Sequence, residues 1–229
     1  MTALLRVSEV YQSIQGEGPN VGSPTTFVRF AGCNLRCPLW PCDTPHAIEP
    51  RIFEKEQLLV TPQDLVHQLN SYPSNICITG GEPFIQNSAA LETFVTYLKA
   101  ESRLVECFSN GTIKYPAWAT EKMTMVMDWK LPGSGEDDTN VVRRNNACQL
   151  APGSYIKFVI ADRHDFDVAV SIWQEFRFRV NYGVEWSYGV AWNKLDNAKL
   201  IEWVLGADLP WKLNMQVHNF IWDRKQRGI

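Results

Sequence analysis

Three of the six cysteines, Cys33, Cys37 and Cys42, fall within ten residues of this 229-residue chain. Thiolates are soft ligands, and three of them in one loop can share one soft metal centre. A structural zinc site takes four protein ligands, whereas a cluster iron that lacks a protein ligand can bind a substrate or cofactor. Three cysteines therefore fit an iron-sulfur cluster with an open coordination position, although the cysteines alone do not settle which metal centre they bind.

His46 keeps a second interpretation open, because C-x3-C-x4-C-x3-H offers four ligands for a zinc site of the kind common in RNA-binding proteins. The net charge of −3, with no Lys or Arg run longer than Arg143-Arg144, argues against a nucleic-acid partner. We therefore expect a small-molecule substrate. Clustered cysteines without a signal peptide or long apolar stretch also predict a cytoplasmic protein that does not enter a membrane.

A second group of candidate residues, Thr79 to Pro83, follows an apolar run. Gly80 and Gly81 let the backbone approach a ligand closely, and the Glu82 carboxylate can accept hydrogen bonds from an ammonium group. Alone, this segment could be an ordinary strand-to-helix turn. Ser109-Asn110-Gly111-Thr112 and Asp128-Trp129-Lys130 also follow apolar runs, so we expect their side chains near the same ligand.

The elements that must position these groups alternate between strand and helix. The spacing of Leu91, Phe94, Val95 and Leu98 predicts a helix, and two more are expected after Thr61 and over Leu200 to Leu205. This alternation predicts one α/β domain, residues 1–229, with a parallel sheet whose carboxyl ends carry the ligand. Leu131 to Asn146 is predicted to be a loop. Predicted strands are Thr26–Ala31, Asn75–Thr79, Leu104–Phe108, Met123–Asp128, Tyr155–Ile160, Val184–Tyr188 and Lys212–Val217.

The N-terminal region contributes two further features. Tyr11 to Gly18 is predicted to be a turn with projecting polar side chains. Arg29 lies within an apolar strand, where an unpaired guanidinium would be costly, so it should face a carboxylate. That carboxylate belongs either to this chain or to a ligand.

The cysteine loop and Gly80-Gly81-Glu82-Pro83 together resemble the radical S-adenosylmethionine (SAM) superfamily, whose cysteine loop usually reads C-x3-C-x2-C. The second gap here is two residues longer. Ser13 to Gly18 is similar to the opening segment of one family within it, the 7-carboxy-7-deazaguanine synthases, in which the length of this loop varies. The resemblance implies a partial (β/α) barrel of the radical SAM type, with helices outside a mostly parallel sheet.

The resemblance also implies an activity and its cofactors. The reaction is conversion of 6-carboxy-5,6,7,8-tetrahydropterin to 7-carboxy-7-deazaguanine by radical ring contraction with loss of ammonia, a step toward queuosine and related 7-deazaguanines. A 4Fe-4S cluster on the three cysteines, SAM and Mg2+ are expected, with Thr44 as the magnesium ligand. Residues expected at the cofactor are Trp40, Asp43, Gly80, Gly81, Glu82, Ser109, Asn110 and Lys130. Residues expected at the substrate are Ile14, Gln15, Gly16, Glu17, Arg29 and Thr79.

The same resemblance implies a homodimer and an external one-electron donor such as flavodoxin or ferredoxin. The roles of Asp128, Lys157 and His218 stay open, and Lys157 could be an outward-facing strand residue. Another radical SAM enzyme, such as an activase that makes a glycyl radical, is the main alternative. Such an enzyme would share the cysteine loop and the Gly-Gly-Glu-Pro segment but not the N-terminal motif with Arg29.

Overall fold

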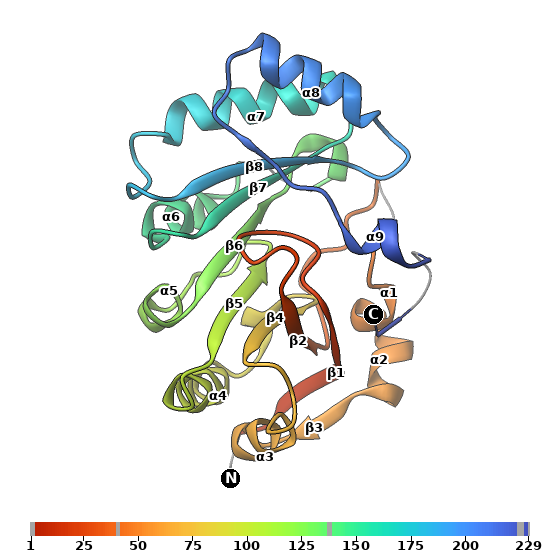
Figure 1. Ribbon diagram of the computed structural model, residues 1–229, viewed down its shortest axis with the longest axis vertical. Helices are drawn as coiled ribbons and strands as arrows, with labels where there is room; N and C mark the ends of the chain where they lie inside the picture. The colour runs from red at the N-terminus through yellow and green to blue at the C-terminus, as the bar shows by residue number, and fades with distance from the viewer. Residues whose placement is uncertain (1–2, 40–41, 137–138, 224–226, 229) are drawn as a thin grey trace.

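One open sheet organises the part of the chain that the computed structural model describes, residues 3–39, 42–136, 139–223 and 227–228 (Figure 1). Within these residues the strand order is β3-β1-β2-β4-β5-β6-β7-β8-β9. The strands are β1 (Leu5–Ile14), β2 (Pro24–Phe30), β3 (Leu58–Val60), β4 (Asn75–Gly80), β5 (Leu104–Ser109), β6 (Thr124–Trp129), β7 (Tyr155–Ile160), β8 (Glu185–Val190) and β9 (Lys212–Leu213). The helices are α1 (Pro45–Ile48), α2 (Pro50–Glu56), α3 (Pro62–Gln68), α4 (Ser88–Ala100), α5 (Ala117–Lys122), α6 (Val141–Gln149), α7 (Arg163–Phe176), α8 (Asn197–Gly206) and α9 (His218–Ile221), with 3-10 turns η1 (Pro83–Ile85) and η2 (Pro132–Ser134).

The sheet is mostly parallel. From β2 through β4 to β9 each neighbouring pair runs parallel, whereas β1 pairs antiparallel with both β2 and β3. Helices α4 to α8 lie around the outside of the curved sheet in Figure 1. The predicted fold class, an open α/β sheet of the partial-barrel kind, is confirmed.

Side-chain alternation along the strands separates the core from a second, polar face. Val28 and Phe30 of β2 are buried in the hydrophobic core, so Arg29 between them points to the opposite side of the sheet. The same alternation places polar side chains of β4, β5, β6 and β7 on that side. We call it the inner face, and its members include Arg29, Thr79, Glu106, Asp128 and Lys157.

The predicted loop over Leu131 to Asn146 is wrong in its second half, where α6 begins at Val141. Asn140 caps this helix by accepting a hydrogen bond from the Arg143 backbone N–H. The helix has no apolar stripe, because its buried face carries the polar side chains of Arg143 and Asn146. Hydrophobic periodicity cannot reveal a helix that is held by polar contacts with a neighbouring loop.

Two other predictions change at the ends of the sheet. The turn predicted over Tyr11 to Gly18 begins later, because residues 11–14 belong to the long strand β1 and the turn comprises residues 15–23. Neither β1 nor β3 was predicted. Only Lys212 and Leu213 of the predicted last strand pair with β8. The chain beyond β9 then crosses in front of the sheet toward α1 in Figure 1. Within the described residues, no helix is both long and apolar enough to span a membrane.

Candidate functional site

The cysteine loop begins where β2 ends, at the carboxyl edge of the parallel strands. Gly32 makes the turn out of the strand with a positive φ of 93°, which a glycine adopts without strain. Cys33, Cys37 and Cys42 are all free thiols and all partly exposed. Cys33 Sγ accepts the backbone N–H of Leu35 at 3.4 Å. The prediction that these cysteines follow a strand end is confirmed.

Gly80 and Gly81 bring the end of β4 against the end of β2. A Cβ atom at Gly80 would overlap the Phe30 backbone, and one at Gly81 would overlap the Gly32 carbonyl oxygen. The Glu82 backbone N–H donates to this same Gly32 oxygen at 2.8 Å. The two glycines are therefore required for the close approach of the strand end to the base of the cysteine loop.

Glu82 is fully buried, and its carboxylate lies among hydrogen-bond donors. Oε1 accepts from the Ser109 hydroxyl at 2.9 Å and Oε2 from the Asn110 backbone N–H at 2.8 Å. Burial raises the pKa of Glu82 to about 7 in spite of these donors. Glu82 thus ties the end of β4 to the end of β5, and its contact with an ammonium group stays a prediction.

The loop after β5 reaches the cysteine loop through Asn110. Its side-chain Nδ2 lies 3.9 Å from Cys33 Sγ and donates to Asn34 Oδ1 at 3.0 Å. Two side chains of helix α6 stabilise this loop. Arg143 Nε donates to the Asn110 carbonyl, and Asn146 Nδ2 donates to the Gly111 carbonyl. The contacts from α6 were not predicted from the sequence. The capping residue Asn140 was a local signal for the start of this helix.

Lys130 ends β6 beside the cysteine loop. Its Nζ donates to Asp128 Oδ2 at 2.6 Å, and its side chain is only 15% exposed, so it is not a solvated lysine. Burial would lower the pKa of Lys130, but the Asp128 carboxylate, and Cys37 when it is a thiolate, raise it instead. Lys130 is therefore a fixed positive charge next to thiols.

The residues present fit an iron-sulfur cluster by donor chemistry and electrostatics. Burial raises the pKa of the Cys37 thiol to about 11, and Lys130 opposes this shift. Such thiols remain protonated until a metal binds and displaces the proton. Among the described residues, no three His, Cys, Asp or Glu side chains form a compact site for a single metal ion. His46, the fourth ligand of the zinc interpretation, instead hydrogen-bonds through Nε2 to Glu9 Oε1 at 3.1 Å.

At the other end of the strands, the β1–β2 loop, residues 15–23, covers part of the inner face. Gln15 is 2% exposed, and its Nε2 donates to Glu106 Oε1 on β5. Asn20 Nδ2 donates to Glu106 Oε2 at 2.9 Å. An added Cβ at Gly18 would lie 3.2 Å from the Val126 side chain, and one at Gly16 would overlap the His218 ring. The loop is therefore tightly packed.

Glu17 of this loop forms an ion pair with Lys157 of β7, and both side chains are nearly buried. Asn214 Nδ2 and Gln216 Nε2 also donate to the Glu17 carboxylate, at 3.0 and 2.9 Å. Burial alone would raise the pKa of Glu17, but Lys157 and the two amides bring it down to about 2. Lys157 thus faces inward, and its interpretation as an outward-facing residue is wrong.

Arg29 faces a carboxylate of this chain, as its burial in an apolar strand predicts. Its Nε donates to Glu9 Oε1 at 2.6 Å and its Nη2 to the Tyr11 hydroxyl at 2.8 Å. Burial raises the pKa of Glu9, but His46 and Arg29 together lower it to about 2. A guanidinium has five N–H donors, so these two bonds leave capacity for a ligand carboxylate.

The other residues predicted for the site lie in β1, in β4 and next to the cysteine loop. Thr79 pairs with Arg29 across β2 and β4, and Ile14 is the last residue of β1. Thr44 Oγ1 lies 3.7 Å from Cys42 Sγ, at the start of α1, and Asp43 beside it is exposed. Trp40, predicted to stack on the cofactor, lies outside the described residues.

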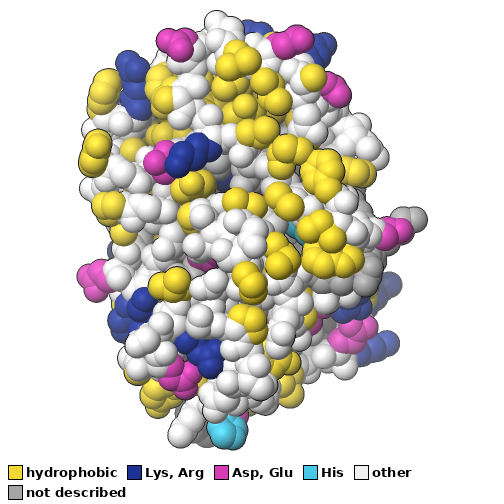
Figure 2. Space-filling model, in the orientation of Figure 1, with side chains coloured by type: hydrophobic (Ala, Val, Ile, Leu, Met, Phe, Trp, Pro, Cys, Tyr) yellow, Lys and Arg dark blue, Asp and Glu magenta, His cyan; other side chains and the backbone are white. Residues whose placement is uncertain are grey.

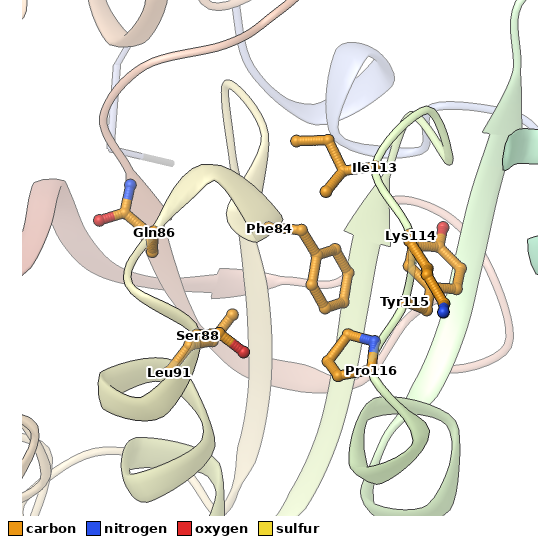
Figure 3. A pocket seen from close by; sticks show the side chains of 8 residues that line it. All are labelled: Phe84, Gln86, Ser88, Leu91, Ile113, Lys114, Tyr115 and Pro116. Atoms are coloured by element: carbon orange, nitrogen blue, oxygen red, sulfur yellow. The ribbon is translucent and has the colours of Figure 1, made fainter.

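A separate pocket of about 270 Å³ lies between the η1–α4 segment and the chain after β5 (Figure 3). Phe84 lies against Tyr115 with ring centroids 4.8 Å apart. Most of the lining is apolar, and none of the predicted cofactor or substrate residues contributes to it. The lining residues are Phe84, Gln86, Ser88, Leu91, Ile113, Lys114, Tyr115 and Pro116.

Comparison with known proteins adds to this geometry. Residues 14–138 match the family model described as "4Fe-4S single cluster domain". The 7-carboxy-7-deazaguanine synthase of Leptospira interrogans is 32% identical, covering 97% of each chain. That of Methanospirillum hungatei is 30% identical over 95% of this chain and 85% of its own. The crystal structure of QueE from Escherichia coli shares the fold, with a TM-score of 0.71 at 21% identity, covering 93% of this chain and 94% of that one.

Proposed function

Because the chain belongs to the 7-carboxy-7-deazaguanine synthase family of radical SAM enzymes, we propose that Cys33, Cys37 and Cys42 hold its 4Fe-4S cluster and that its inner face receives the pterin. The enzyme converts 6-carboxy-5,6,7,8-tetrahydropterin to 7-carboxy-7-deazaguanine by radical ring contraction. Loss of ammonia accounts for the whole change in composition, so the reaction needs no net oxidant. When bound, the cluster and SAM would supply the radical chemistry, a 5′-deoxyadenosyl radical for hydrogen-atom abstraction.

The observation that carries the proposal is the meeting of three strand ends at the carboxyl edge. The cysteine loop after β2, Gly81-Glu82 after β4 and Ser109-Asn110 after β5 are joined by hydrogen bonds. In parallel α/β sheets ligands bind at this edge. It is therefore the place where the chain would hold a cluster and a cofactor together.

At the cofactor, the chain's own residues bind and orient. Lys130 offers a fixed positive charge for the SAM carboxylate. Gly80, Gly81 and Glu82 are proposed to receive its ammonium, through acceptors that include the Glu82 carboxylate. Asn110 and Ser109, both held by Glu82, border the same space. Asp43 and Trp40 complete the proposed set.

At the substrate, Arg29 binds the carboxylate of the pterin with a planar pair of N–H donors. Glu9 and Tyr11 fix the plane of that guanidinium, so the substrate is oriented before reaction. Thr79 lies beside Arg29 on the neighbouring strand, while Gln15, Gly16 and Glu17, which follow Ile14, close the inner face at its amino end. This closure excludes water and other hydrogen donors from the substrate.

The test is anaerobic reconstitution with iron and sulfide, followed by product analysis with SAM, a reductant and 6-carboxytetrahydropterin. We expect the wild type to be brown and to form 7-carboxy-7-deazaguanine. We expect Cys37→Ala to form no 7-carboxy-7-deazaguanine. A brown protein that cleaves SAM to 5′-deoxyadenosine without forming the deazaguanine would keep the cofactor assignment and reject the substrate. A colourless protein that retains zinc would reject both.

We also propose that Thr44 is the protein ligand of a Mg2+ ion at the substrate carboxylate. A single hydroxyl is a weak site, so substrate oxygens and waters would complete the octahedron. Thr44→Ala should reduce stimulation by magnesium while iron content stays unchanged, and Thr44→Ser should retain it. If magnesium stimulates Thr44→Ala as strongly as the wild type, Thr44 is not part of the site.

The proposed homodimer, external one-electron donor and cytoplasmic location rest on the family resemblance. An apolar surface supports the dimer: Figure 2 shows apolar side chains gathered where α9 lies, and Phe220 and Ile221 of this helix are 70% and 54% exposed. Light scattering on the wild type and on Phe220→Glu tests it, because a dimer that uses this surface should dissociate in the variant.

A further inference from the structure

Glu106 is a buried carboxylate on the inner face to which the proposed mechanism gives no role. It is 2% exposed in the middle of β5, between Val105 and Cys107 of the core. The inner-face carboxylates Glu17 and Asp128 form ion pairs with lysines, and Glu9 pairs with Arg29. The hydrogen bonds to the Glu106 carboxylate come instead from neutral groups, the side-chain amides of Gln15 and Asn20 and the Cys77 thiol.

These two amides belong to the loop that covers the substrate side of the inner face. Gln15 Nε2 donates to Glu106 Oε1, and Gln15 Oε1 accepts the backbone N–H of Glu17 at 3.3 Å. An ionised carboxylate can only accept hydrogen bonds, so it selects the NH2 end of the Gln15 amide. The oxygen end is thereby turned toward Glu17, and the amide has one orientation.

The backbone of Gln15 does not depend on Glu106. Its N–H donates to the Ser23 carbonyl and its carbonyl accepts from Gly22 N–H, both at 2.8 Å, as in a continued hairpin. A change at Glu106 therefore alters the orientation of the amide while the hairpin keeps its own bonds. This separation makes a positioning role testable apart from folding.

We propose that Glu106 is a positioning residue for the substrate, which acts by fixing the orientation of the Gln15 amide at the amino end of the inner face. The inference rests on the proposed function, because Gln15 is one of the residues assigned to the pterin. Protonated Glu106, or a glutamine in its place, can both donate and accept. Either change removes the stronger of the two constraints on the Gln15 amide and leaves only the 3.3 Å bond from the Glu17 backbone N–H to hold its orientation.

The ionisation of Glu106 then affects substrate binding. Burial raises the pKa of Glu106 to about 6, against the lowering effect of the Gln15 and Asn20 amides. The titratable groups that face it are Cys77 of β4 and Glu17 of the loop, while Cys107 follows it on β5 and points into the core. Both thiols stay protonated because burial raises their pKa. As pH falls through about 6, Glu106 takes up a proton and the fixed orientation is lost.

The test compares reconstituted wild type and Glu106→Gln across pH 5 to 8, with Glu121→Gln on the exposed side of α5 as matched control. We expect the variant to raise KM for the pterin about tenfold, the effect of losing one hydrogen bond to a charged group, with a much smaller change in kcat. The fall of kcat/KM below about pH 6 should be present in the wild type and absent from the variant. Any inflection from Glu82 should remain in both.

Asn20→Ala provides a second variant, since it removes the other donor and keeps the carboxylate. It should raise KM less than Glu106→Gln and leave the pH inflection in place. Unchanged KM and an unchanged pH profile in Glu106→Gln would overturn the inference while wild-type turnover upholds the proposed function. A wild type that binds SAM but forms no deazaguanine would instead reject the function on which it rests.

Discussion

The two ends of the parallel strands are built in different ways. At the carboxyl edge, loops meet through close backbone approach, as where Gly81 lies against the Gly32 carbonyl, and the three cysteines remain partly exposed. At the amino end, the β1–β2 loop is held by side chains, chiefly the ion pair between Glu17 and Lys157. The edge proposed for the cofactors is thus open to added groups, whereas the end proposed for the substrate is closed by the chain itself.

The charges of the two ends differ accordingly. Glu17 has a cation partner, and after the opposing effect of burial its pKa is lowered to about 2. Glu82 at the carboxyl edge is held by neutral donors, and burial raises its pKa to about 7. The Glu17–Lys157 pair at the closed end therefore keeps its charges, whereas Glu82 at the carboxyl edge and Glu106 beneath the β1–β2 loop change protonation near pH 7 and pH 6.

The largest expected effect on stability comes from removing the ion pair between Glu17 and Lys157 at the closed end. Lys157→Met leaves Glu17 buried without its cation, which should lower the free energy of unfolding by about 3–5 kcal/mol. Denaturant titration measures this loss. The double variant Lys157→Met, Glu17→Gln removes both charges and should recover most of it. If the single and double variants are equally unstable, the ion pair is not what holds the loop.

A smaller effect is expected from adding one methyl group at the carboxyl edge. In Gly81→Ala the new Cβ would overlap the Gly32 carbonyl oxygen and approach Cys33, so we expect a cost of about 1–3 kcal/mol and a lower iron content after reconstitution. Gly206→Ala at the end of α8 is the control, because nothing lies within 4 Å of its Cβ. Equal iron retention in both variants would show that the close approach is dispensable.

A dependence on pH has the smallest effect over any one pH unit. The pKa of Glu82 rises from 4.5 to about 7 on folding, so the folded state holds the proton more tightly. Its contribution to stability therefore falls as pH rises from 4.5 to 7, by at most about 1.4 kcal/mol per pH unit. Unfolding measured across this range should show a shallower fall for Glu82→Gln. Identical slopes would mean that Glu82 is ionised throughout.

The same contrast explains what the sequence could predict. The carboxyl edge is built from contiguous motifs that follow strands, so the positions of Cys33, Gly80-Gly81-Glu82 and Ser109-Asn110 could be predicted from short-range patterns. The closed end joins residues that are 91, 140 and 199 positions apart, in the pairs Gln15–Glu106, Glu17–Lys157 and Glu17–Gln216. No local pattern encodes such pairs.

Helix α6 shows a second limit. Arg143 and Asn146 are buried because their donors reach backbone carbonyls of the loop after β5. In the sequence they look like surface residues, since polar side chains mostly lie exposed. Their burial follows from the three-dimensional position of that loop, which periodicity does not contain.

The central claim, that one chain joins radical chemistry at the carboxyl edge to a pterin held on the inner face, is tested most directly by isotope transfer. Reconstituted protein is incubated with SAM, a reductant and 6-carboxytetrahydropterin deuterated at the saturated ring carbons, and the nucleoside fraction is examined by mass spectrometry. We predict deuterium in SAM or 5′-deoxyadenosine together with 7-carboxy-7-deazaguanine. Product without deuterium transfer, or cofactor cleavage that leaves the deuterated pterin unchanged, would contradict the account.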